Sequence, residues 1–101
     1  MARHTIDMTG LTTKDFLVNF RRGEQYHNTI QNASGQSAAI TVTNAPMGTA
    51  DEVAAAPFTN PVGGALNIAN GGIDQLDEPY VALRITLGAP GSGPIYIAEA
   101  G

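Results

Sequence analysis

The segment from Tyr80 to Leu87 constrains the fold more than any other part of the chain. Apolar and other residues alternate along it at a period of two, which predicts a β-strand buried on one face only. The inward face is expected to hold Val81, Leu83, Ile85 and Leu87, and the outward face Tyr80, Ala82, Arg84 and Thr86. The glycine-rich segment 88–93 is short enough to form a turn, so Ile95 and Ile97 are expected to join the same apolar face in a β-hairpin.

Shorter segments show a similar alternation and are bounded by turn residues. Strands are predicted at 26–31, with Tyr26, Asn28 and Ile30 on one face, at 38–43, with Ile40 and Val42 inward and Thr41 and Thr43 outward, and at 61–68, with Val62, Leu66 and Ile68 buried. Residues 32–37 and 70–72 are rich in Asn, Ser and Gly and are predicted to be turns. The acidic segment 73–79 is predicted to be a loop that leads into the last two strands.

Residues 13–22 are compatible with two structures. Phe16, Leu17 and Phe20 would share one face of a helix, whereas Phe16, Val18 and Phe20 alternate as in a strand. Phe, Val and Asn are poor helix formers, so a strand is favoured.

These segments amount to about seven short strands separated by turn signals. A sheet with one apolar face must pack that face against another layer, and a second sheet is the layer that this chain can supply. The predicted fold is therefore all-β, a small antiparallel β-sandwich. With 101 residues the chain is expected to form a single domain, placed at residues 11–101.

Residues 1–10 alternate weakly and are predicted to be an edge strand or an extended N-terminal arm. Their large apolar residues are few, and ordering a residue costs about 1 to 2 kcal/mol, so burial against this domain alone is not expected to hold the arm. We expect a neighbouring protein to order the arm, with Ile6 and Met8 as its anchors.

The composition excludes several classes of function. The chain has no cysteine, which excludes disulfides and thiolate chemistry. Its net charge of −4, with Arg21-Arg22 as the only basic pair, disfavours a nucleic-acid partner. No apolar run has the length of a signal peptide or a membrane span, so we expect synthesis in the cytoplasm and no membrane partner. Only 14% of the residues are charged, which indicates a neutral surface that other subunits cover.

No motif in the chain specifies a catalytic, cofactor or metal site, so a non-enzymatic role without cofactor is predicted. His4 and His27 lack a nearby serine and carboxylate pattern. Asp74, Asp77 and Glu78 lack the spacing of a calcium loop, and the adjacent side chains of Asp51 and Glu52 diverge. The glycine pairs lack the lysine of a phosphate-binding loop and are predicted to be turns. Tyr26, Tyr80 and Tyr96 are either a stacking platform for a ligand or, as is more usual on strands, half-buried cross-strand partners.

The central run from Gly23 to Gly35, followed by Ile40-Thr41-Val42-Thr43, resembles small virion proteins of tailed bacteriophages. In head-decoration (cement) proteins of that kind, a strand, an Asn-x-Ser-Gly turn and a Thr/Val strand recur, and Tyr80 to Gly101 resembles their closing hairpin. The resemblance covers most of the chain and includes no diagnostic motif. Head–tail joining and tail-fibre modules share the same features.

The resemblance implies a structural protein of the virion. Such a protein binds the outer face of a capsid, bridges neighbouring subunits of the major capsid protein, and is expected to be a homo-oligomer. Ile6, Met8, Tyr26, Tyr80 and Tyr96 are the candidate interaction residues. A carbohydrate- or receptor-binding module that uses the tyrosines is the main alternative, and a small hydrolase that uses His27 and acidic residues is a third.

Overall fold

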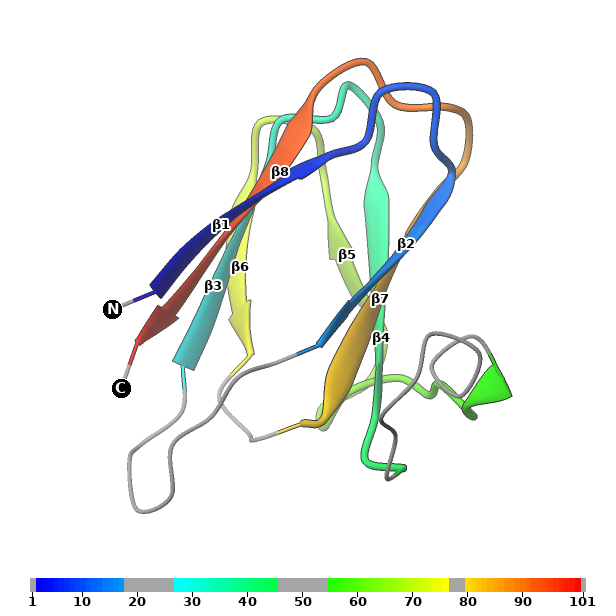
Figure 1. Ribbon diagram of the computed structural model, residues 1–101, viewed down its shortest axis with the longest axis vertical. Helices are drawn as coiled ribbons and strands as arrows, with labels where there is room; N and C mark the ends of the chain where they lie inside the picture. The colour runs from blue at the N-terminus through cyan, green and yellow to red at the C-terminus, as the bar shows by residue number, and fades with distance from the viewer. Residues whose placement is uncertain (1, 18–26, 46–54, 77–79, 101) are drawn as a thin grey trace.

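The structure, a computed structural model of the chain, describes residues 2–17, 27–45, 55–76 and 80–100. Its strands are β1 Ala2–Asp7, β2 Thr13–Leu17, β3 His27–Asn32, β4 Ala38–Thr43, β5 Leu66–Ile68, β6 Ile73–Leu76, β7 Ala82–Leu87 and β8 Pro94–Ala100. They form two antiparallel sheets of four strands each, which face each other (Figure 1). The predicted antiparallel β-sandwich is therefore confirmed, with eight strands rather than seven.

Two segment predictions have different outcomes. Residues 13–17 form β2, so the strand favoured over a helix is confirmed there, and residues 18–22 lie outside the described part. The acidic loop predicted at 73–79 is wrong over 73–76, because Ile73–Leu76 is strand β6, paired with β3, and residues 77–79 lie outside the described part. This short edge strand buries only Leu76, so it lacks the apolar alternation that would have indicated a strand.

The strands are ordered β1-β8-β3-β6 in the first sheet and β2-β7-β4-β5 in the second. Along the chain, β1 pairs with β8, β2 with β7, β3 with β6 and β4 with β5, so the chain forms one long antiparallel ribbon. The ribbon is wound so that β3 also pairs with β8, and β4 with β7. This winding is the jelly-roll form of the β-sandwich.

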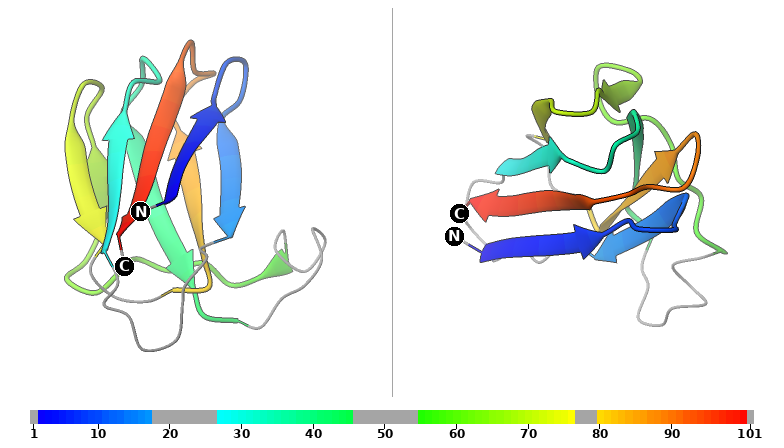
Figure 2. Two further views of the ribbon diagram at one scale, coloured as in Figure 1. Left: turned by 60° about the vertical axis from the view of Figure 1, so that its left-hand side comes forward. Right: turned by 90° about the horizontal axis from the view of Figure 1, so that it is seen from above.

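The predicted hairpin of β7 and β8 is wrong, because these strands lie in different sheets (Figure 2). The segment between them runs beside the segment between β1 and β2. Met8 N–H donates to Gly93 O at 3.2 Å, and Gly10 N–H donates to Gly91 O at 3.0 Å. A Cβ on Gly91 would lie 2.7 Å from the Met8 carbonyl oxygen, so this approach requires glycine. The glycines thus let both strands of the ribbon cross together from one sheet to the other.

A second crossing, from β3 and β6 to β4 and β5, is organised by the buried side chain of Asn32. Its Nδ2 donates to the carbonyl oxygens of Gln36 at 2.7 Å and of Ile68 at 2.8 Å. Its Oδ1 accepts from Ser34 N–H at 3.0 Å and from Ser34 Oγ at 2.6 Å. Asn32 belongs to the first sheet and Ile68 to the second, so one amide links the two sheets. The turns predicted at 32–37 and 70–72 are confirmed as bends of this crossing.

The core between the sheets matches most of the predicted inward residues. Those that are buried as predicted are Ile40, Val42, Ile68, Leu83, Ile85, Leu87, Ile95 and Ile97. Leu66 is only partly buried. Asn28 and Ile30 are predicted to share a face, and both are buried; Tyr26, predicted on the same face, lies outside the described residues.

Burial departs from the predicted faces at other positions. Tyr80 is predicted outward but is buried in the core, and Val81 is predicted inward but is only half-buried. Ala82 and Thr43 lie opposite each other in the pairing of β7 and β4 and are buried, although they alternate with the inward residues Leu83 and Val42. Tyr80 precedes β7, so the alternation of that strand does not set its direction. Ala82 is a small residue on an inner strand, which pairs on one side with β2 and on the other with β4. Val62 is 73% exposed because it lies in the turn before β5.

The N-terminal arm is part of the domain rather than an extension that a neighbouring protein orders. β1 is an edge strand that pairs along its whole length with β8, from Ala2 opposite Glu99 to Asp7 opposite Pro94. Ile6 and Met8 are buried in the core. The expectation that they anchor a partner is wrong, because the core of the same chain already covers them.

We predict that Leu83→Ala or Ile85→Ala lowers the free energy of unfolding by about 2 to 5 kcal/mol, the usual range for emptying a buried aliphatic site. Both side chains are 0% exposed on the inner strand β7. Thr86→Ala on the outward face of the same strand is the matched control and should cost far less. Chemical denaturation measures all three, and equal losses would contradict the observed faces of β7.

Candidate interaction surface

The outward side of the first sheet is the candidate site, and it is built from two rows of side chains. The strand register places Thr5, Tyr96, Gln31 and Ile73 in one row across β1, β8, β3 and β6. The same register places Arg3, Ala98, Thr29 and Gln75 in the next row. We call these eight residues the outer face. They include one cation, no carboxylate, and a majority of neutral polar or small side chains.

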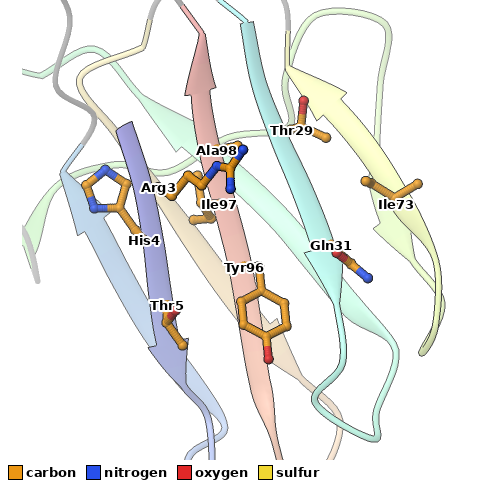
Figure 3. Close-up of a pocket in the computed structure, with 9 residues that line it drawn as sticks. All are labelled: Arg3, His4, Thr5, Thr29, Gln31, Ile73, Tyr96, Ile97 and Ala98. Atoms are coloured by element: carbon orange, nitrogen blue, oxygen red, sulfur yellow. The ribbon is translucent and has the colours of Figure 1, made fainter. Parts of the chain in front are cut away.

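A shallow hollow of about 300 Å³ lies on the outer face. Ala98 and Thr29 are small, so they form a low floor between longer side chains. Arg3 reaches from β1 across β8, and the Tyr96 ring lies farther along the same strand (Figure 3). Gln31 and Ile73 line the hollow from the side of β3 and β6. The hollow therefore combines a guanidinium, an aromatic ring, an amide and an aliphatic side chain.

The outer face carries two exposed large hydrophobic side chains. Tyr96 is 43% exposed and Ile73 is 63% exposed. Figure 2 shows no described segment over this face. Exposed aromatic and aliphatic side chains in a patch with few charges are typical of protein interfaces.

The outward side of the second sheet differs, because its charged and aromatic groups bind one another. Arg84 lies directly opposite Asp15 in the pairing of β7 and β2, with Nε to Oδ1 at 2.7 Å and Nη2 to Oδ2 at 3.1 Å. These bonds raise the pKa of Arg84 above its ordinary value. The Arg84 guanidinium also lies 4.0 Å from the centre of the Phe58 ring. On this side of the second sheet, the Arg84 guanidinium is therefore already bound to a carboxylate and packed on an aromatic ring.

The two tyrosines that the structure describes, Tyr80 and Tyr96, do not form a shared platform. Tyr80 is buried, and its hydroxyl accepts a hydrogen bond from Val62 N–H at 3.1 Å. Tyr96 lies on the outer face, and Tyr26 lies outside the described residues. Of the five candidate interaction residues, Tyr96 is thus the one that the structure places on the surface, since Ile6 and Met8 are in the core.

The other candidate side chains form no reactive cluster in the described part of the chain. The His4 ring packs edge-on against Phe16 of β2, with ring centres 4.8 Å apart. Asp74 accepts a hydrogen bond from Gln75 N–H at 2.8 Å. No three His, Asp or Glu side chains among these residues lie close enough to hold a metal ion. Asp51, Glu52, Asp77 and Glu78 lie outside the described residues, as does the side chain of His27.

No helix in the described residues has the length and hydropathy needed to cross a membrane. Comparisons with protein-family models, curated proteins and solved structures find no match to this chain. The strand order of the two sheets defines the class of the protein as an eight-stranded jelly-roll domain.

Of the eight residues of the outer face, sequence reasoning singled out Tyr96 and missed the other seven, which are Arg3, Thr5, Thr29, Gln31, Ile73, Gln75 and Ala98. The alternation in β1, β3 and β8 indicates which residues point outward, so that part of the signal was present. The register that aligns these residues in two rows depends on pairing between distant segments, such as Arg3 with Ala98. No local pattern carries that information.

Proposed function

We propose that the protein is a non-enzymatic structural component of a bacteriophage virion, which binds the outside of the capsid and bridges neighbouring capsid subunits. The observation that carries the proposal is the outer face, a neutral sheet surface with exposed Tyr96 and Ile73 and no described segment over it. Such a face is suited to adhesion to another protein, because seven of its eight side chains are uncharged and two of them are large and exposed.

The fold adds support of a weaker kind. Jelly-roll domains occur in viral capsid proteins and in lectins. A shared fold alone does not set function, so this likeness only raises the weight of the virion proposal and of its carbohydrate-binding alternative.

In this proposal each protein needs only one modest contact with the shell. A capsid repeats the same binding site many times, and a homo-oligomer that engages several sites at once gains affinity through multivalency. Attachment would stabilise the shell because one oligomer holds several capsid subunits in place.

Carbohydrate binding is the second candidate, and Tyr96 is the observation that favours it. An exposed aromatic ring beside a hollow with hydroxyl, amide and guanidinium groups has the chemistry of a sugar site. A glycan array run on the purified protein tests this candidate directly. Binding to a defined glycan that Tyr96→Ala abolishes would favour the carbohydrate role over adhesion to a shell.

The capsid role predicts co-sedimentation of the purified protein with empty capsids of the phage that encodes it, assembled without it. The double variant Tyr96→Ala/Ile73→Ala should weaken binding by about tenfold or more, as expected for truncating two large contact side chains of an interface. Leu11→Ala is the matched control, because Leu11 is 38% exposed and lies outside the outer face. If wild-type protein stays in the supernatant, the capsid role is wrong. If the double variant binds as well as the wild type, another face makes the contact.

A further inference from the structure

Arg3 is the unneutralised cation of the outer face. It forms no ion pair with any residue that the structure describes. The contrast with Arg84 is direct, since each arginine projects outward from a strand of its sheet. Asp15 lies opposite Arg84, whereas Ala98 lies opposite Arg3. The Ala98 methyl group offers the guanidinium no acceptor, and no residue that the structure describes forms a hydrogen bond with it.

We propose that this hollow receives an aspartate or glutamate side chain of a partner protein, with Arg3 as its ionic contact. The proposal rests on the proposed function for the identity of the partner alone. The planar fork of an arginine guanidinium matches a carboxylate with two parallel hydrogen bonds. The bound carboxylate takes the place that Asp15 has beside Arg84 in the second sheet.

The rest of the hollow supports a side chain of this kind. Ala98 and Thr29 form the floor, which leaves space next to the guanidinium, as Figure 3 shows. The Gln31 amide and the Thr29 hydroxyl can donate further hydrogen bonds to a carboxylate oxygen. Tyr96 and Ile73 form apolar walls, which suit the methylene groups that precede a carboxylate in Asp or Glu.

Charge decides between a protein carboxylate and a polyanion. The chain carries nine acidic and five basic residues, for a net charge of −4. A phosphate polymer would be repelled by that excess and would meet a single cation on the outer face. A partner surface with a single carboxylate and few other charges, by contrast, matches the single guanidinium of the outer face.

Nuclear magnetic resonance of the purified, isotope-labelled protein tests the proposal without any capsid. The probes are N-acetyl-glutamate N-methylamide and its glutamine counterpart at equal ionic strength, which differ only in the side-chain carboxylate. The glutamate compound should shift the Arg3 side-chain N–H signal and the amide signals of Thr29 and Ala98. These shifts should be about fivefold larger than those with the glutamine compound, because a charged acceptor forms the stronger bond.

The variant Arg3→Gln should remove the difference between the two compounds. Lys14→Gln is the matched control, because it removes the same charge from an exposed position on the edge strand β2. The proposal is overturned if both compounds shift these signals equally, or if Arg3→Gln retains the difference. It is also overturned if the signals move with protein concentration alone, since a second copy of the chain would then fill the hollow. A selective shift in a protein that fails to sediment with capsids supports the carboxylate site and rejects only the capsid role.

Discussion

Replacement of Asn32 by leucine is expected to lower the free energy of unfolding by about 3 to 5 kcal/mol, although leucine fills a similar volume and is more apolar. The cause lies in the groups that the amide leaves behind. The carbonyl oxygens of Gln36 and Ile68 would lose the Nδ2 donor, and Ser34 would lose its acceptor. Buried polar groups without partners cost more than the hydrogen bonds themselves contributed. Chemical denaturation monitored by circular dichroism measures the loss.

Asn28 is the matched control for this prediction. It lies four residues earlier on the same face of β3 and is also 0% exposed. Its Nδ2 and Oδ1 form no hydrogen bond with any described residue. Asn28→Leu should therefore be neutral or stabilising by up to about 2 kcal/mol, since it removes a buried amide without leaving a partner group unsatisfied. Equal destabilisation by both variants would mean that loss of volume matching, and not the Asn32 network, sets the cost.

The strands themselves could be predicted because burial alternates locally. Residues 38–43 are predicted as a strand with the bounds of β4, because Ile40 and Val42 alternate with threonines and turn residues flank the segment on both sides. The pairing of the strands could not be predicted in this way. A glycine-rich segment such as 88–93 indicates that the chain changes direction there. The same residue types are found in a hairpin turn and in a crossing between sheets, so the segment does not distinguish the two. The contact of Gly91 with the Met8 carbonyl, which decides the matter, joins segments at opposite ends of the chain.

The candidate site was harder to predict than the fold for the same reason. Tyr96 could be singled out from its residue type, but Tyr80 is of the same type and is buried, as is Met8, which was also a candidate. Whether each of these residues is exposed or buried depends on its place in the jelly roll, and that place follows from the winding of the whole ribbon. The outer face is a product of tertiary structure, because four strands from distant parts of the chain each contribute two residues to it.

Deletion of residues 2–9 is expected to abolish cooperative folding of the isolated protein. The deletion removes β1, which pairs with β8 along its length, and with it the buried side chains of Ile6 and Met8. Loss of two such side chains costs about 4 to 10 kcal/mol, at about 2 to 5 kcal/mol each. The total stability of a domain is about 5 to 15 kcal/mol, so little or none would remain. Loss of the β1 backbone bonds would also expose the edge of β8, an aggregation risk.

Thermal unfolding followed by circular dichroism and size-exclusion chromatography of the truncated chain test this prediction. The control is the double variant Arg3→Ser/Thr5→Ser, which keeps β1 and changes only two outward positions of that strand. It should melt close to the wild-type temperature, since exposed substitutions change stability by about 0.5 kcal/mol or less. A truncated chain that stays monomeric and melts like the wild type would show that β8 and the core do not need β1. In that case Ile6 and Met8 would again be candidates for contact with a partner protein.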